Sequence, residues 1–134
     1  MTKTRTAVCA CGRLTATCNG EPARVIACAC VDCQRRTGSD YGVGLYFPEG
    51  QVMTSGVSKL FARTSNAGLS VRCHFCPDCG TTLHWTLELR PGLVGIAAGA
   101  FVDNDIPAPN FAVFARNRRP WTHLPDGPSF EAMP

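Results

Sequence analysis

Short runs of hydrophobic residues, each bounded by Gly, Pro, Asn, Asp or Ser, dominate the sequence. Such runs, alternating or rich in β-forming residues, are typical of strands joined by turns. We expect strands at Leu14–Cys18, Tyr41–Phe47, Lys59–Arg63, Leu69–Phe75, Thr81–Leu87, Leu93–Ala98 and Phe111–Phe114. No stretch keeps a helical period, and only Val31–Thr37 and Val102–Asp105 suit a helical turn. The pattern therefore predicts a mainly β protein.

The chain of 134 residues suits one domain, because this length buries about two-thirds of the surface that the unfolded chain exposes. It contains no internal repeat and no linker that would divide it, so we expect a single domain over residues 1–134. The proline-rich end, Arg119–Pro134, should run over the surface in extended form, held by Trp121 and Phe130.

Nine cysteines are the unusual feature of the composition. The first residues carry positive charge but no apolar stretch of signal-peptide length, which favours a cytoplasmic protein. The longest apolar run, Leu93–Phe101, is about half the length of a membrane span and is broken by glycine, so no membrane association is expected. In a reducing compartment, clustered cysteines indicate metal or redox chemistry and not a disulfide scaffold.

The formal charge of +3 suggests a basic protein only while the cysteines are counted as neutral. If seven of the nine cysteines bind two Zn²⁺ ions as thiolates, the two sites together carry a negative charge that offsets it, and the holo protein is near neutral. Aromatic residues are sparse as well, so we expect no nucleic-acid partner.

Two cysteine pairs are each followed at once by glycine. Cys76 and Cys79 have the two-residue spacing of a zinc knuckle, and Cys9 and Cys11 form the second pair. Gly80 and Gly12 supply the backbone freedom that each tight turn needs. A structural zinc takes four ligands, so we expect the two pairs to form one closed Cys₄ site. The alternative is a redox pair or a set of buried thiols.

Cys28, Cys30 and Cys33 form a third cluster with three ligands in six residues. Three thiolates and a vacant position are typical of a reactive zinc site, which can accept a substrate thiol as the fourth sulfur. Bound there, the thiol would lose its proton and remain a nucleophile near neutral pH. The alternative is that Cys73, His74 or His84 closes the site. Cys73 could equally be a structural or spare thiol, and Cys18 a small buried hydrophobe.

These motifs resemble the glutathione-dependent formaldehyde-activating enzyme family, which also includes the centromere protein V group. The matching pieces are the Cys9–Gly12 pair, the Cys28–Cys33 cluster running into Gln34–Ser39, the Phe75–Thr81 knuckle and the tail from Arg118 to Gly127. They occur in order and span almost the whole chain. Position 29 is alanine, where many members carry histidine between the first two cysteines.

The resemblance implies an Mss4-like fold of curved antiparallel sheets with two zinc ions. It assigns a structural zinc to Cys9, Cys11, Cys76 and Cys79 and a catalytic zinc to Cys28, Cys30 and Cys33. It implies a carbon–sulfur lyase that resembles S-(hydroxymethyl)glutathione synthase, with glutathione or a similar small thiol as partner and formaldehyde or another electrophile as co-substrate. The alternative is a non-catalytic zinc module that binds a partner or a thiol.

Arg35 and Arg36 directly follow the open cluster. A glutathione-like substrate carries two carboxylates, which guanidinium groups can bind with two parallel hydrogen bonds. We therefore expect these arginines to bind substrate; the alternative is two solvated side chains.

Overall fold

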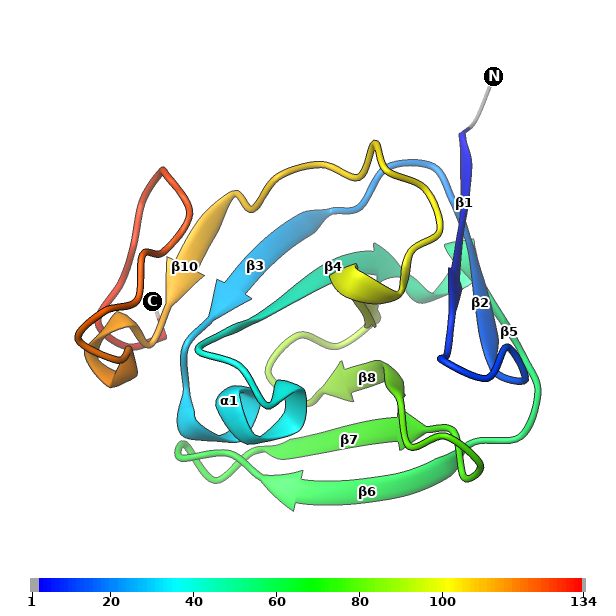
Figure 1. Ribbon diagram of the computed structural model, residues 1–134, viewed down its shortest axis with the longest axis horizontal. Helices are drawn as coiled ribbons and strands as arrows, with labels where there is room; N and C mark the ends of the chain where they lie inside the picture. The colour runs from blue at the N-terminus through cyan, green and yellow to red at the C-terminus, as the bar shows by residue number, and fades with distance from the viewer. Residues whose placement is uncertain (1–2, 134) are drawn as a thin grey trace.

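The computed structural model describes residues 3–133 and is mainly β, as the sequence predicts (Figure 1). Its strands are β1 (Thr4–Val8), β2 (Thr15–Asn19), β3 (Arg24–Cys28), β4 (Gly42–Pro48), β5 (Val52–Ser55), β6 (Lys59–Thr64), β7 (Ser70–Phe75), β8 (Thr82–Leu87), β9 (Leu93–Ala97) and β10 (Phe111–Val113). The α-helix within the described part is α1 (Val31–Thr37), and short 3-10 turns are η1 (Glu49–Gln51), η2 (Ala98–Ala100) and η3 (Ala115–Asn117). No helix within residues 3–133 has the length and hydrophobicity that a membrane crossing requires.

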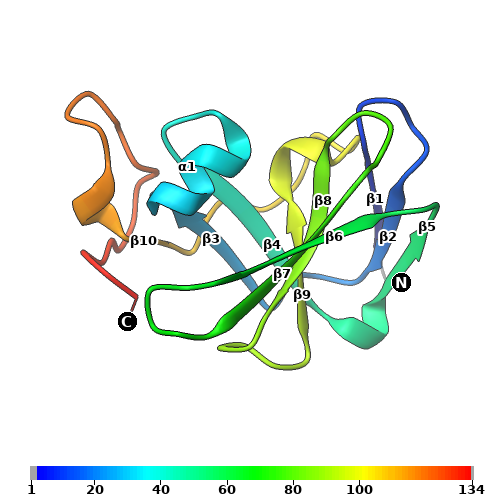
Figure 2. The same ribbon diagram turned by 90° about the horizontal axis from the view of Figure 1, so that it is seen from below.

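The strands form two sheets. A three-stranded antiparallel sheet has the order β1-β2-β5, and a seven-stranded sheet has the order β10-β3-β4-β9-β8-β7-β6. Only the β10–β3 pair of the seven-stranded sheet is parallel. Both ribbon views place the small sheet at one end of the molecule and β10 with the C-terminal segment at the other (Figures 1 and 2). The large sheet curls between them, with α1 lying against it. This is the expected Mss4-like arrangement of curved antiparallel sheets.

Strand β4 has apolar neighbours on both faces. Its Leu45 and Phe47 are fully buried in the main hydrophobic core, which joins the two sheets. The alternate residues of β4 point the other way, and Tyr46 belongs to a second apolar cluster with Trp85 and Val113. Burial on both faces explains the unbroken apolar run of this strand, and the second cluster borders the site described below.

The sequence-based prediction misses three strands and places one turn wrongly. The pattern does not predict β1, β3 or β5. Val102–Asp105, expected as a helical turn, is not helical; the 3-10 turn η2 lies just before it. The backbone N–H of Val102 donates to the carbonyl of Thr6 at 3.0 Å, and Asp103 Oδ2 accepts from the N–H of Thr6 at 3.0 Å. These bonds hold the segment beside β1 in a non-helical form.

The C-terminal segment is held differently from the expectation. Trp121 is 67% exposed and therefore does not anchor it. Phe130 packs edge-on against Phe111 with ring centroids 5.9 Å apart, its backbone N–H donates to the carbonyl of Ala112 in β10, and its carbonyl accepts from the N–H of Ala115. Of the two expected anchors, only Phe130 therefore attaches the segment.

Candidate metal centres and the cavity beside them

Four of the clustered cysteines meet where two turns come together. Cys9 and Cys11 lie in the β1–β2 turn, Cys76 and Cys79 in the β7–β8 turn, and their four sulfurs lie within 4.8 Å of one another. The Sγ of Cys11 is 3.6 Å from that of Cys9 and 3.6 Å from that of Cys76. Tetrahedral Zn–S bonds of ~2.3 Å would place the sulfurs ~3.8 Å apart. The donor set and its spacing therefore fit a four-coordinate zinc.

The backbone of both turns is shaped for this contact. Gly12 and Gly80 have φ values of +86° and +79°, which side chains with a Cβ rarely adopt. The two turns are also tied to each other, because Thr81 Oγ1 accepts from the N–H of Ala10 at 3.1 Å. Hydrogen bonds from the hydroxyl and backbone of Thr81 lower the pKa of Cys79 to about 5, which favours the thiolate that a metal requires.

Cys28, Cys30 and Cys33 form the second cluster, at the end of β3 and the start of α1. Their three sulfurs also lie within 4.8 Å of one another. The Sγ of Cys30 caps the helix by accepting from the N–H of Cys33 at 3.3 Å. The helix then ends at Gly38, which has a φ of +65°. This short capped helix is the element that folds the third sulfur back toward the first two.

The three thiols strongly affect one another's protonation. Hydrogen bonds from Cys28 and Cys33 lower the pKa of Cys30, and the contacts with Cys30 and Cys33 raise the pKa of Cys28. When one sulfur ionises, its neighbours therefore hold their protons more tightly. A cation among them removes this conflict, since thiolates and not thiols ligate metals. The seven cysteines thus form two groups that could bind metal, and soft thiolate donors suit zinc.

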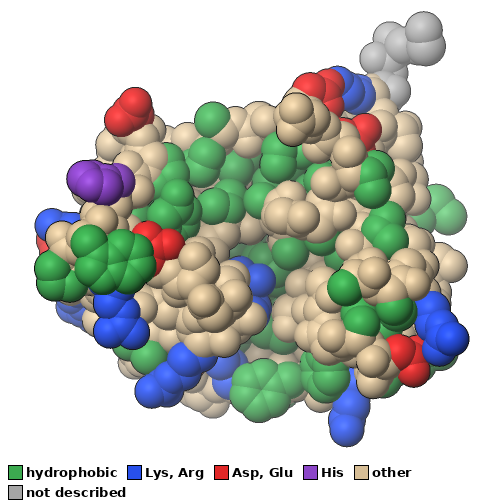
Figure 3. All heavy atoms as spheres, in the orientation of Figure 1, with side chains coloured by type: hydrophobic (Ala, Val, Ile, Leu, Met, Phe, Trp, Pro, Cys, Tyr) green, Lys and Arg blue, Asp and Glu red, His purple; other side chains and the backbone are tan. Residues whose placement is uncertain are grey.

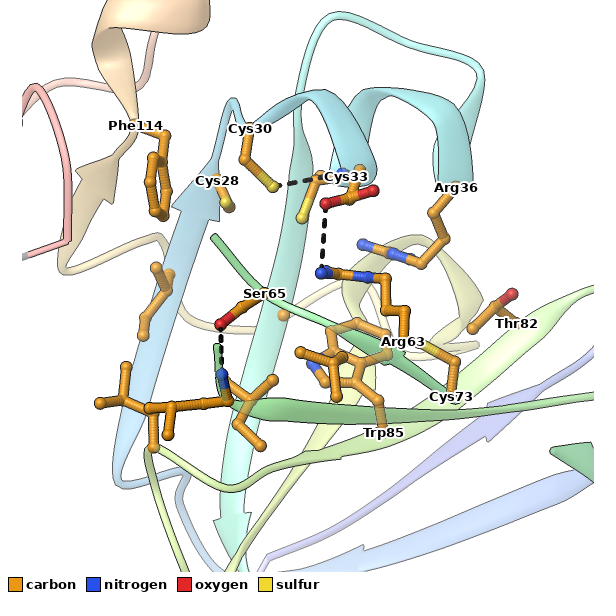
Figure 4. Close-up of a pocket in the computed structure, with 18 of the residues that line it drawn as sticks. Cys28, Cys30, Cys33, Arg36, Arg63, Ser65, Cys73, Thr82, Trp85 and Phe114 are labelled. Carbon is orange, nitrogen blue, oxygen red and sulfur yellow. Dashed lines mark hydrogen bonds and ion pairs between the residues drawn. The ribbon is translucent and has the colours of Figure 1, made fainter. Parts of the chain in front are cut away.

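The three fourth-ligand candidates lie outside the second cluster. Among residues 3–133, no further His, Cys, Asp or Glu ligand atom joins the mutual 4.8 Å group. His74 and His84 stack on each other with ring centroids 4.6 Å apart, and His74 Nδ1 contacts the Ser58 hydroxyl. In the close-up, Cys73 lies apart from the three cysteines, on the far side of Arg63 (Figure 4). The described side chains therefore leave one side of this cluster open.

That open side faces a cavity of about 830 Å³, which all three cysteines help to line. Its volume is within the range of ligand pockets. The walls are mostly apolar and aromatic and include Ile26, Tyr46, Val71, Trp85, Val113 and Phe114. In the space-filling view the surface is hollowed near its centre, beside α1, with hydrophobic and basic side chains at the hollow (Figure 3). Cys73 also lines the cavity, and burial raises the pKa of its thiol.

The two arginines after the cluster have different surroundings. Arg36 is half-buried, and its guanidinium lies 4.3 Å from the ring centroid of Trp85, whereas Arg35 is exposed at the rim. A third arginine, Arg63 on β6, reaches the cavity from the opposite side and pairs with Asp32 of α1 at 3.2 Å. Figure 4 shows Arg36 and Arg63 directed into the space below the cysteines. The site therefore offers positive charge close to the sulfur cluster.

Three glycines make room for this arrangement. Added Cβ atoms would lie 2.5 Å from Nη2 of Arg36 at Gly42, 2.7 Å from the Trp85 ring at Gly44 and 2.4 Å from Trp85 Nε1 at Gly95. The indole N–H of Trp85 donates to the Tyr46 hydroxyl at 2.9 Å, which fixes the ring beneath Arg36. The guanidinium therefore lies over the indole, and the phenol meets the indole edge-on with an interplanar angle of 77°; we call these three groups the Arg36–Trp85–Tyr46 stack.

Sequence reasoning did not identify Arg63, Trp85 or Tyr46 as part of the site. They come from β6, β8 and β4, so only the folded sheet brings them together. The alternation of residues along such a strand could have indicated which of them face the cavity. Gly42, Gly44 and Tyr46 all line the cavity from β4, whereas the intervening Val43 and Leu45 do not.

Comparison with known proteins agrees with this architecture. A family model described as glutathione-dependent formaldehyde-activating enzyme matches residues 4–117. The crystal structure of a Rhodobacter sphaeroides protein is similar in fold, with a TM-score of 0.56 at 18% identity over 76% of this chain and 90% of that chain. No protein of curated function matches the sequence. Because the family model covers most of the chain and all seven clustered cysteines, the chain belongs to the family of glutathione-dependent formaldehyde-activating enzymes.

Proposed function

We propose that the protein is a zinc-dependent carbon–sulfur lyase that acts on the adduct of a small, glutathione-like thiol with formaldehyde or another electrophile. The observation that carries this proposal is the cluster of Cys28, Cys30 and Cys33, which opens on a cavity of about 830 Å³. A purely structural site needs no such opening, because its four ligands come from the protein. Family membership supports the same chemistry.

The two cysteine groups would have different roles. Cys9, Cys11, Cys76 and Cys79 would hold a structural zinc that joins the β1–β2 and β7–β8 turns. Cys28, Cys30 and Cys33 would hold the catalytic zinc. When bound there, zinc supplies a position for a substrate thiolate and so keeps a sulfur nucleophile available near neutral pH.

The net reaction of synthesis needs no oxidant or reductant. The thiol sulfur forms a bond to the carbonyl carbon, the carbon–oxygen π bond breaks, and the proton lost by the thiol ends on the oxygen. The apolar walls of the cavity would exclude water from this step. Arg36, ordered by its contact with Trp85, would bind a carboxylate of the thiol and orient the sulfur toward the three cysteines.

The test is the Cys30→Ser variant, with metal content, melting and turnover measured on the same preparation. We expect about one zinc per chain to be lost and thiol-dependent addition to formaldehyde to disappear. The fold should remain, because the other cysteine group would hold the structural zinc. Cys18→Ser is the matched control, since Cys18 is buried but belongs to neither cluster, and it should keep both metals.

Retained turnover in Cys30→Ser would show that the chemistry lies elsewhere. A parent protein that binds two zinc ions and thiol but turns over no adduct would indicate the alternative, a non-catalytic zinc module.

A further inference from the structure

We propose that the electrophile accepted at this site carries a hydrophobic body, so that aliphatic or aromatic aldehydes are better substrates than formaldehyde. The inference rests on the proposed function and specifies its substrate class. It comes from the apolar wall of the cavity, which has no role in the thiol addition or in binding of a carboxylate by the arginines.

Several residues of the second apolar cluster line the cavity. Ile26, Val71, Trp85 and Val113 are at most 6% exposed, yet all four line the cavity of about 830 Å³. Protein interiors normally pack without voids much larger than a water molecule. An apolar hollow of this size is therefore better explained by an apolar ligand group than by imperfect packing.

The apolar wall starts at the sulfur cluster itself. Ile26 is two residues before Cys28 on β3, so both side chains point to the same face of the strand. Val113 is the register partner of Cys28 on the neighbouring strand β10. A substituent on a carbon bonded to the substrate sulfur would therefore meet hydrocarbon directly. Formaldehyde has no substituent that could use these contacts.

Phe114 provides an independent observation. It is the one non-glycine residue with positive φ within the described chain, at +55°, a conformation that is unfavourable for a bulky side chain. Its ring lies beside Cys28 at the cavity (Figure 4). A strained aromatic at the edge of a reactive cluster suggests that the strain is kept for a contact with substrate.

Charge separates the two ends of the substrate. Asp32 is the only acidic residue that lines the cavity within the described chain, and it is paired with Arg63. Arg36 on α1 and Arg63 on β6 reach the cavity from opposite sides, Arg90 lines it from the β8–β9 turn, and the side chains of Ile26, Val71 and Val113 carry no charge. A carboxylate of the anionic thiol would bind at Arg36, and the hydrocarbon of the aldehyde would lie against Ile26, Val71 and Val113. The addition itself remains balanced as written above, for any substituent on the carbonyl carbon.

The experiment has a kinetic arm and a binding arm. With glutathione as the thiol, we would measure kcat/KM for straight-chain aldehydes from formaldehyde to hexanal. Burial of one methylene group contributes about 0.8 kcal/mol, so kcat/KM should rise about fourfold per carbon until the wall is covered. The binding arm measures the Kd of S-methyl- to S-hexylglutathione by calorimetry, and Kd should fall by a similar factor per carbon without any turnover.

The variant Phe114→Asn tests the contact between the substrate's hydrocarbon and the cavity wall without destabilising the fold. Asparagine tolerates positive φ, so this substitution relieves backbone strain while it removes the aromatic surface. We expect a melting temperature close to that of the parent and a clearly smaller dependence of Kd on alkyl length. Leu60→Asn is the matched control, because Leu60 is 39% exposed and does not line the cavity, and its chain-length dependence should equal that of the parent.

The outcomes separate this inference from the proposed function. If formaldehyde is turned over but both series are flat or fall with chain length, the inference is wrong and the proposed function stands. If Kd falls with alkyl length but no aldehyde reacts, the proposed function is wrong, and the apolar preference of the cavity stands.

Discussion

Gly95→Ala is the sharpest test of the Arg36–Trp85–Tyr46 stack. Gly95 is the register partner of both Tyr46 and Trp85, so it lies beneath the hydrogen bond that joins them. A Cβ at this position would lie 2.4 Å from Trp85 Nε1 and 2.9 Å from Cε1 of Tyr46. Neither contact is with the end of a flexible side chain, so the indole or the sheet must move.

Forced overpacking of this kind costs about 1–3 kcal/mol of unfolding free energy. For 134 residues, an unfolding entropy near 2.1 cal/mol/K per residue converts this cost to a fall in melting temperature of about 4–11 °C. Gly50→Ala is the control, because a Cβ there meets nothing within 4 Å, and it should melt at the parent temperature or slightly higher.

Tryptophan fluorescence reports on the stack itself. The chain has two tryptophans, and Trp121 is 67% exposed, so a Trp121→Phe background leaves emission from Trp85 alone. We expect Gly95→Ala to change this emission and to weaken thiol binding, because Arg36 loses its platform. If the variant melts like the parent with unchanged Trp85 emission, the stack is not closely packed and our account of Arg36 is refuted.

Three further predictions follow from the same geometry. Cys76→Ser should abolish stable folding, because structural zinc can contribute ~10 kcal/mol or more; soluble expression with the parent melting curve would contradict a Cys₄ zinc. Arg36→Ala should weaken glutathione binding by about 1.5–3 kcal/mol in calorimetry, whereas the exposed Arg35→Ala should change it little; equal losses would argue against the stack. Burial, with the nearby charge of His74, lowers the pKa of His84 to about 4 from an ordinary 6.5. The unfolded chain therefore binds the proton first, and the unfolding free energy of the parent relative to His84→Phe should fall as pH drops from 6.5 to 4; a constant difference would show normal titration.

The cysteine groups could be predicted from the sequence because metal ligation depends on local spacing. The spacing of Cys76 and Cys79 predicts a turn that brings their two sulfurs together. A four-coordinate zinc then requires a second pair of ligands. In the fold, Cys11 and Cys76 are in contact although they are 65 positions apart in the sequence. Helix α1 has the predicted bounds because a cap, a short polar run and Gly38 all lie within nine residues.

The missed features depend on contacts that the sequence does not display. β5 exposes most of its surface, with Met53 at 70%, so it lacks the alternation that marks a half-buried strand. β3 ends in the cysteine cluster, and its residues Val25 to Ala27 are all buried, so it too lacks alternation. The difference between Arg35 and Arg36 depends on which face of α1 meets Trp85, a residue about fifty positions further on.

The two cysteine groups share one ligand chemistry, so their proposed roles must come from what surrounds them. Around the first group, Cys9 and Cys76 are 3% and 0% exposed and belong to the main core, and the same two turns supply the remaining sulfurs, from Cys11 and Cys79. Around the second, the curl of the large sheet leaves a hollow where a fourth ligand would otherwise lie. Part of its wall is the Trp85 ring, and that ring fits there because Gly44 of β4 and Gly95 of β9 have no Cβ that would contact it. Substrate access at Cys28, Cys30 and Cys33 would therefore be a property of the sheet and not of the cysteine motif. A family member with the same cysteines but a larger residue at the position of Gly44 or Gly95 should bind zinc equally well and differ in the thiols and aldehydes that it accepts.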